Sequence, residues 1–232
     1  MTFKRALKIN WLYSLYFNFH YLPLKQAIKL PVILFRPKLL KCKGEVIIDT
    51  EIIKTGMIQL GEFLVSLYPD KGIVWENNGG KIIFKGTCII GNSSALSIGE
   101  KGNCIVGNNF RATAGLKLTS HHRIQFAENV LIAWEVIIMD TSFHRLKDRN
   151  GDFKNKGYGP IYIGKNNWIT ARCMILNGTK TPDYCILGAG SVVNKDYSNS
   201  QSHILLAGNP LEIKVKEIWI DLEDHDISDY LE

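Results

Sequence analysis

The chain has 232 residues, of which 46% are hydrophobic and 22% charged, so it is long enough to bury one sizeable core and is neither disordered nor collagen-like. Its net charge of +6 is unevenly placed, because residues 1–43 carry nine Lys or Arg and no acid, whereas residues 217–232 carry seven acids and no Lys or Arg. The longest apolar run is far shorter than the roughly 20 residues that span a bilayer, and the start lacks a signal-peptide pattern, so we expect a cytoplasmic protein.

The first predicted element is an amphipathic helix between Phe3 and Leu22, ending at Pro23, and a second short helix is expected to end near residue 30. Its apolar stripe recurs every four positions and is widened by further apolar residues: Phe3, Leu7, Trp11, Leu15 and Phe19, with Leu12, Tyr16 and Leu22. We expect this stripe to pack on the protein's own body or on a neighbouring subunit. Peripheral contact with the inner face of a membrane is the alternative, and the acidic tail is a further partner for the basic charge. No nucleic-acid-binding motif accompanies the charge, so nucleic acid is not an expected partner.

A six-residue period organises the rest of the chain. The period places large residues in one column and small residues in a second column four positions later: Ile163, Ile169, Ile175, Thr181, Leu187 and Val193, then Asn167, Cys173, Thr179, Cys185 and Ser191. An upstream block repeats the pattern with Phe126, Ile132 and Ile138, followed four positions later by Val130, Val136 and Ser142. Neither an α-helix nor a simple strand has this period, but a triangular coil of three short strands does. The five cysteines form no C-x-x-C pair, so we expect reduced, buried thiols.

These repeats resemble the hexapeptide-repeat acyltransferases over about residues 80–216, most strongly in residues 161–178, 187–193 and 207–210. The resemblance implies an all-β fold, a left-handed parallel β-helix over residues 44–208, with a helical segment before it and a short extension over residues 209–232. It also implies a homotrimer whose active sites lie between neighbouring subunits. The implied donor is acetyl-CoA, and the implied acceptor is a sugar or a polysaccharide precursor.

His144 occupies the next position of the upstream column, where the pattern asks for an aliphatic residue. The polar residues 145–160 that follow have no hexad, so we predict a loop that leaves the prism with His144 at its mouth. Acetyl transfer needs a base for the acceptor proton, and histidine can accept a proton near neutral pH. Asp140 and His144 together resemble the family's catalytic segment, in which Asp140 would orient the imidazole or hold a substrate hydroxyl. A solvated loop histidine beside a corner aspartate is the alternative.

The resemblance further implies residues that contact the coenzyme: Trp168, Ala171, Gly188, Ala189, Asn209, Pro210, Lys214 and Lys216. The small residues would leave room for the pantetheine arm, and the lysines would meet the phosphates. A structural role for the small residues and plain solvation of the lysines are the alternatives. Trp134 is also expected to point off the prism axis, and contact between subunits is the alternative role for both tryptophans.

We expect no metal, because the neighbouring His121 and His122 do not match the zinc pattern of the γ-class carbonic anhydrases, which share the prism. The expected function is transfer of an acetyl group from acetyl-CoA to a sugar hydroxyl, with His144 as general base. N-acetylation of a nucleotide-linked amino sugar and a non-catalytic β-helix that binds or assembles partners remain open alternatives. Five cations between residues 145 and 156 favour an anionic acceptor.

Overall fold

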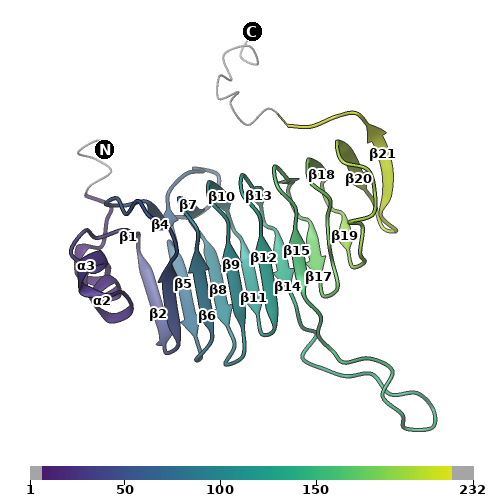
Figure 1. The fold of residues 1–232 in the computed structure, drawn as a ribbon, viewed down its shortest axis with the longest axis horizontal. Helices are drawn as coiled ribbons and strands as arrows, with labels where there is room; N and C mark the ends of the chain where they lie inside the picture. The colour runs from purple at the N-terminus through teal and green to yellow at the C-terminus, as the bar shows by residue number, and fades with distance from the viewer. Residues whose placement is uncertain (1–6, 221–232) are drawn as a thin grey trace.

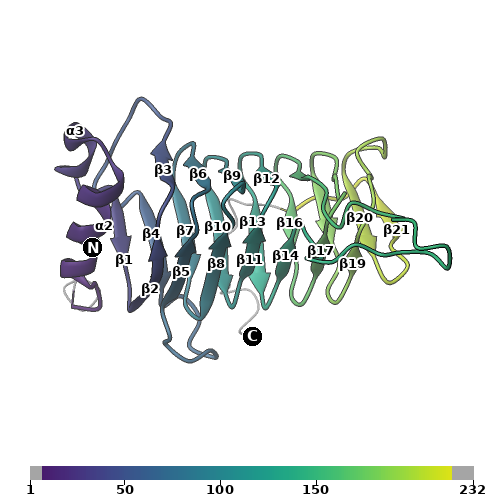
Figure 2. The ribbon, with the colours of Figure 1, turned by 90° about the horizontal axis from the view of Figure 1, so that it is seen from below.

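The computed structural model describes residues 7–220, which form a prism of parallel strands with two helices across one end (Figures 1 and 2). The chain passes from one face of the prism to the next, and each strand pairs with the strand one coil earlier. This arrangement confirms the parallel β-helix predicted from the six-residue period. Among the described residues, no helix combines the length and the apolar character that crossing a membrane requires.

Three sheets form the faces of the prism. The first face has nine strands: β1 (Val32–Leu34), β4 (Ile58–Glu62), β7 (Cys88–Gly91), β10 (Phe110–Ala114), β13 (Leu131–Trp134), β16 (Trp168–Ile169), β18 (Cys185–Leu187), β20 (Ile204–Ala207) and β21 (Glu212–Lys216). The second face has seven: β2 (Pro37–Cys42), β5 (Ile73–Asn77), β8 (Ser94–Ile98), β11 (Lys117–Ser120), β14 (Ile137–Met139), β17 (Met174–Leu176) and β19 (Val192–Val193). The third face has five: β3 (Glu45–Ile48), β6 (Lys81–Phe84), β9 (Asn103–Val106), β12 (Arg123–Phe126) and β15 (Ile161–Ile163).

Apart from the coil that contains the insertion between β14 and β15, the number of residues per coil falls along the chain. Ile89 pairs with Arg111, which is 22 positions later, and Arg111 pairs with Leu131 after another 20. Trp168 pairs with Ile186 after 18 positions, the length of three hexads. The strict six-residue period therefore belongs to the downstream coils, and the upstream coils hold extra residues at their corners.

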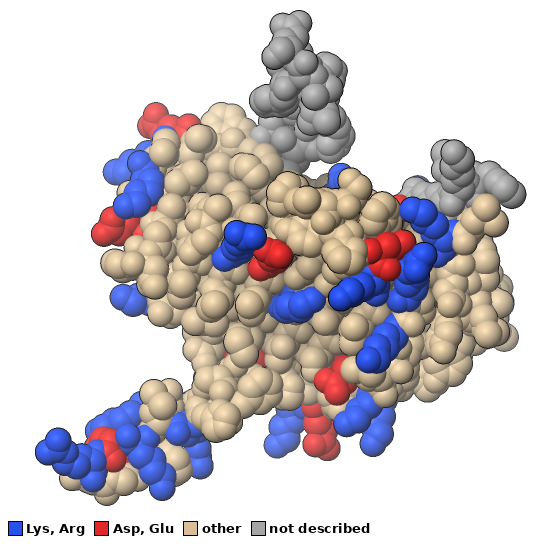
Figure 3. All heavy atoms as spheres, turned by 180° about the vertical axis from the view of Figure 1, so that it is seen from behind, with Lys and Arg blue, Asp and Glu red and all other residues tan. Residues whose placement is uncertain are grey.

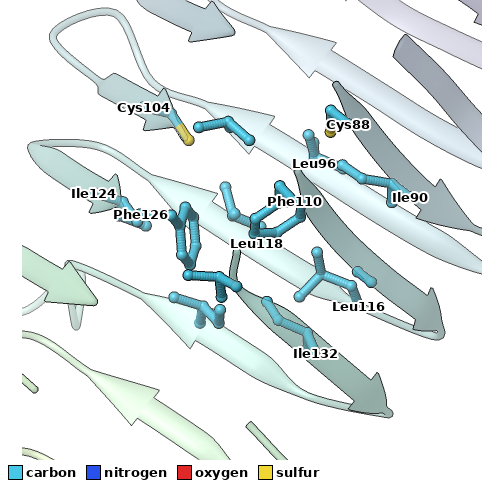
Figure 4. Packing of buried hydrophobic residues seen from close by; sticks show 14 of the residues in the cluster. Cys88, Ile90, Leu96, Cys104, Phe110, Leu116, Leu118, Ile124, Phe126 and Ile132 are labelled. Atoms are coloured by element: carbon cyan, nitrogen blue, oxygen red, sulfur yellow. The ribbon is translucent and has the colours of Figure 1, made fainter. Parts of the chain in front are cut away.

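The interior is filled by the two predicted columns. All eleven residues of the downstream columns are buried, as are Phe126, Ile132 and Ile138 of the upstream block. Figure 4 shows labelled side chains from neighbouring strands pointing toward one another in the interior, with Phe110 and Phe126 among them. Ser142 was expected at a small buried position but is exposed, because the chain has already left the prism there.

Four of the five cysteines are buried, and all five are free thiols. Burial raises the pKa of the Cys185 thiol to about 12, and it raises the pKa values of Cys88 and Cys104 as well. A thiol held in its protonated form is a poor nucleophile and a poor metal ligand. These cysteines therefore serve as small packing residues, as the hexad pattern predicts.

Replacing Phe126 by alanine is expected to lower the free energy of unfolding by about 3–5 kcal/mol. The side chain is 1% exposed, and its ring centroid lies 4.9 Å from that of Phe110, so truncation leaves a cavity between coils. Urea unfolding at one fixed protein concentration measures the change. Phe153→Ala is the matched control, because the same atoms are removed from a half-exposed ring. Equal stabilities for the two variants would contradict the assigned core.

Two helices, α2 (Trp11–Tyr21) and α3 (Leu24–Ala27), lie across the end of the prism next to β1 (Figure 2). The side chain of Asn18 donates to Val32 O at 2.7 Å and accepts from Val32 N at 3.1 Å. The hydroxyl of Ser14 accepts from Leu34 N at 2.9 Å. These bonds satisfy the backbone groups on the outer edge of β1, which would otherwise lack partners. The polar side of α2 therefore faces the protein.

Most of the apolar stripe of the predicted helix faces the opposite way, although its last residue, Leu22, is buried in the core. The helix begins at Trp11, so the described residues 7–10 of the predicted helix are not helical. Leu12 is 77% exposed and Phe19 is 50% exposed, whereas the ring of Phe17 is buried with its centroid 5.0 Å from that of Trp75. The expectation that the stripe covers the protein's own body is therefore wrong for most of its residues, because the bonds to β1 turn the opposite side of the helix inward, and contact with a neighbouring subunit stays a prediction. Phe3, the first residue of the predicted stripe, lies outside the described residues.

The β-helix begins earlier than predicted. Strands β1 and β2 already pair in parallel with β4 and β5, so the first coil starts at Val32 rather than at residue 44. At the other end, β21 pairs antiparallel with β20 and closes the first face. The described part of the predicted extension, residues 209–220, thus adds a strand to the prism.

Candidate functional site

The turns between faces stack into corners that run along the prism. The first corner joins the first face to the second, as between β13 and β14, and the second corner joins the second face to the third, as between β14 and β15. The predicted site residues fall mainly at these two corners. The second corner holds the candidate base, and the first corner holds most of the candidate coenzyme residues.

Asp140 is fully buried at the second corner, directly after β14. Its carboxylate accepts hydrogen bonds from His121 N at 2.8 Å, from His122 N at 2.9 Å and from Ser120 Oγ at 3.2 Å. Three donors satisfy much of the hydrogen-bonding capacity of the carboxylate and fix its position. Asp140 thus joins its coil to the previous one. Among the described residues, its hydrogen-bond partners do not include His144.

Residues 142–157 leave the prism at this corner as a loop that projects from the body in Figure 1, so the excursion begins and ends about three residues earlier than the predicted 145–160. The base of the loop is closed. Thr141 forms an antiparallel bridge with Tyr158, and Ser142 N donates to Gly157 O at 2.8 Å. Thr141 Oγ1 donates to the same carbonyl at 3.1 Å. The chain therefore leaves and re-enters the prism at one fixed point.

His144 lies exposed next to this closed base. Ser142 Oγ donates to His144 O at 2.8 Å, and Gly157 has a φ of +74°, with space for no side chain because a Cβ would lie 2.7 Å from His144 O. The ring nitrogen Nδ1 of His144 lies 3.2 Å from Ser142 O. A carbonyl oxygen can only accept, so Nδ1 carries the hydrogen and Nε2 of the neutral ring is left as the free base.

Four further side chains surround the base of the loop, and the sequence analysis gave none of them a role in the site. The His121 ring lies 4.8 Å from the Phe143 ring, and the His122 ring lies 4.9 Å from the Tyr158 ring. The coil length is the signal that could have identified the two histidines. A coil of 20 residues, rather than 18, places the two histidines one coil before the start of the loop.

Small residues occupy the turns of the first corner. Ala171 comes after β16, and Gly188, Ala189 and Gly190 come after β18. The two turns are stacked, because Gly190 N donates to Ala171 O at 3.0 Å. Ala189 is exposed, and Ala171 and Gly188 are partly buried, so this part of the corner offers accessible backbone with little side-chain bulk.

Both tryptophans lie near this corner. Trp168 is partly buried on the first face, and Trp134 is 39% exposed at the corner itself. Arg172 N donates to Trp134 O at 2.8 Å, so Trp134 lies one coil before the turn that holds Ala171. Arg172 also forms an ion pair with Glu135 at 2.8 Å.

The last candidate residues lie beyond the final coil. Asn209 and Pro210 are exposed directly after β20, and Lys214 and Lys216 are exposed on β21. Lys214 Nζ forms an ion pair with Glu212 at 2.8 Å, whereas Lys216 forms none with another described residue. Lys216 is therefore the less engaged of the two lysines.

Within one chain, His144 and the small residues at the first corner do not meet. A strand of the second face separates the two corners in each coil. Within residues 7–220, no group of three or more His, Cys, Asp or Glu residues is placed to hold a metal ion.

Comparison with known proteins gives relatives by sequence and by fold. No family model matches the chain. Galactoside O-acetyltransferase of Escherichia coli K12 is 33% identical over 113 residues, which cover 47% of this chain and 52% of that protein. A protein of Staphylococcus aureus Mu50, provisionally named an acetyltransferase, is 38% identical over 79 residues, which cover 33% of this chain and 38% of that protein. The chain thus matches about half or less of the length of these relatives.

Among solved structures, the polySia-specific acetyltransferase NeuO matches with a TM-score of 0.59 and 18% identity, covering 83% of this chain and 76% of that one. At this identity the match concerns the fold alone. It confirms the expected left-handed parallel β-helix.

Proposed function

We propose that this chain, which shares the left-handed β-helix and part of its sequence with hexapeptide-repeat acetyltransferases, transfers an acetyl group from acetyl-CoA to a hydroxyl of a sugar or polysaccharide precursor. The observation that carries the proposal is the break in the buried column at His144. The prism interior is otherwise filled by apolar side chains, both aliphatic and aromatic, and by small residues, yet the chain leaves it here and exposes an imidazole whose Nε2 has no hydrogen-bond partner among the described residues.

In the proposed reaction, Nε2 of His144 removes the proton from the acceptor hydroxyl as its oxygen attacks the thioester carbonyl. The carbon–sulfur bond then breaks, the acetyl ester is formed, and the imidazolium returns the proton to the departing thiolate of CoA. The contact between Nδ1 and Ser142 O holds the ring in the tautomer that this step needs. Asp140 supports the step through the corner beneath the loop, and we assign it a positioning role.

The donor is proposed to lie along the first corner, where Ala171, Gly188 and Ala189 expose backbone beside little bulk. Trp168, Asn209 and Pro210 border the same part of the prism. Lys216, with Lys214 as the second candidate, would meet the phosphates. Because this corner lies apart from His144 within one chain, we propose a homotrimer in which each site takes His144 from one subunit and the first corner from the next.

The test is to follow CoA release with acetyl-CoA against neutral sugars, acidic sugars, nucleotide-linked amino sugars and oligosaccharides. Ester formation on a sugar hydroxyl is the expected result. Amide formation on an amino sugar would support N-acetylation instead. Absence of turnover together with no stabilisation by CoA would overturn the proposal in favour of a non-catalytic module.

We propose further that the acceptor is anionic, because the loop carries five cations and two acids (Figure 3). A hollow of about 400 Å³ on the loop is lined by Arg145, Phe153, Lys154, Asn155, Lys156 and Tyr158. Lys154 is paired with Asp148 at 2.8 Å. Arg145 lies over the Phe153 ring, with its guanidinium carbon 3.6 Å from the ring centroid. Arg145 and Lys156 therefore have charge available for a ligand.

Changing both Arg145 and Lys156 to glutamine is expected to raise KM for an acidic saccharide by roughly tenfold, because two attractive charges are lost. KM for a neutral saccharide should change little, and added salt should weaken binding of the acidic saccharide to the unaltered protein. Steady-state kinetics with the two saccharides measures the difference. Lys54→Gln, which removes an exposed charge away from the loop, is the control. Equal changes in KM for both saccharides would contradict an electrostatic role.

A further inference from the structure

The outward side of α2 is an apolar surface without a partner among the described residues. Leu12, Leu15, Tyr16 and Phe19 follow the spacing i, i+3, i+4, i+7, so they share one side of the helix. They are 77%, 43%, 49% and 50% exposed, respectively. We call these four residues the α2 outer face. They lie across the helix from the buried Ser14, Phe17 and Asn18.

This orientation is fixed by the contacts on the inner side. Ser14 and Asn18 bind the backbone of β1, so the helix cannot rotate to bury its outer face without leaving backbone groups of that strand unpaired. Nearby, Leu24 and Ile28 are 68% and 63% exposed, which extends the apolar surface past α3. An exposed apolar surface of this kind on a rigid end of a molecule indicates a binding surface.

The basic charge near this surface favours an anionic partner. Residues 7–43 contain seven Lys or Arg and no acid, and one of the seven, Arg36, is paired with Asp70. Lys25 and Lys29 are exposed beside Leu24 and Ile28, and neither forms an ion pair with another residue in 7–220. Two copies meeting through this surface would bring like charges together, which is unfavourable, whereas an anionic bilayer offers the opposite charge. Aromatic and aliphatic side chains with flanking lysines are typical of helices that lie in the membrane interface.

We propose that the α2 outer face is a membrane-docking surface that binds a bilayer containing anionic lipid. The helices cover one end of the prism, and the last strands form the other end (Figures 1 and 2). In Figure 3 this end lies on the right and is largely uncharged at its tip. Docking through it leaves the two corners and the projecting loop on the sides of the prism, away from the lipid.

The test is co-sedimentation of the full chain with vesicles of phosphatidylcholine alone and with vesicles that also contain phosphatidylglycerol. The expected result is binding to the anionic vesicles that weakens with added salt. The double variant Leu12→Ser and Phe19→Ser should lose about tenfold or more in vesicle affinity, because each apolar side chain contributes to insertion. Lys25→Gln with Lys29→Gln should lower binding to anionic vesicles only.

The matched control is Leu67→Ser with Leu146→Ser, which removes two similarly exposed apolar side chains from loops further along the prism and should leave binding unchanged. Circular dichroism and melting temperature should be the same for all variants, because none of these side chains is buried. Failure of the unaltered chain to bind anionic vesicles at low salt would overturn the proposal. Self-association that the Leu12 and Phe19 changes abolish, without vesicle binding, would assign the surface to a second copy instead. Neither outcome depends on acetyl transfer, so the proposed function is tested separately.

Discussion

Replacing His144 by alanine is expected to lower kcat/KM for acetyl transfer by about 10²- to 10⁴-fold, the range for loss of a general base. The exposed imidazole has Nε2 free, and its described hydrogen bonds lie within the loop base, so its removal should leave the prism intact. CoA release against the best acceptor measures the loss. Thermal stabilisation by CoA should remain, because the proposed donor site lies at the first corner.

The control for this change is His203→Ala. His203 is a partly buried histidine that stacks on Tyr184 at 4.4 Å, away from the loop. Its loss should leave kcat/KM close to that of the unaltered protein. A His144→Ala protein that retains most of its activity would remove His144 from the chemistry. Loss of CoA stabilisation in the same variant would instead indicate that the change disturbs the fold.

Mixed trimers are expected to recover activity that neither parent possesses. One parent is His144→Ala, and the other is Ala189→Trp, which places a large ring on the exposed turn where the donor is proposed to lie. If each site takes its base from one subunit and its donor corner from the next, every trimer that contains both variants has one intact site, so about a third of the sites are restored in the mixed trimers. Trimers isolated with two different affinity tags, assayed for CoA release, give the fraction.

The parent Ala189→Trp should show a much higher KM for acetyl-CoA with an unchanged melting temperature. Isolated mixed trimers with no activity above the parents would mean that both groups serve a site within one chain. A monomeric unaltered protein would contradict the intersubunit site directly. Ala189→Ser, a small change at the same position, should behave like the unaltered protein and controls for substitution at this turn.

The core of the prism could be predicted from sequence because stacking imposes a repeat on it. A column residue such as Ile169 must be large and apolar, and Cys173 must be small, so the pattern is visible without coordinates. The widths of the upstream corners could not be predicted, since turn residues point to solvent and follow no such rule. The orientation of α2 was missed for a related reason. The backbone of β1 forms hydrogen bonds with the side chains of Ser14 and Asn18, which turn the opposite side of α2 inward, and the sequence does not reveal that strand edge.

The candidate site could be predicted only in part. His144 was identifiable because it interrupts a column, and its exposure agrees with that reading. The partners of Asp140 were not identifiable, because they lie a coil of 20 residues earlier, a spacing outside the hexad pattern. The coenzyme residues came from resemblance alone, and their roles stay predictions.

The closed base of the loop over residues 142–157 has an evolutionary consequence. Because Thr141 meets Tyr158 where the excursion starts and ends, insertions, deletions or wholesale exchange of the intervening residues need not shift the register of the adjoining coils. If the loop contacts the acceptor as proposed, acceptor preference can change by replacement of this loop while the coils of the prism are retained. Replacing residues 142–157 by the corresponding loop of a relative would test whether this segment determines acceptor selectivity.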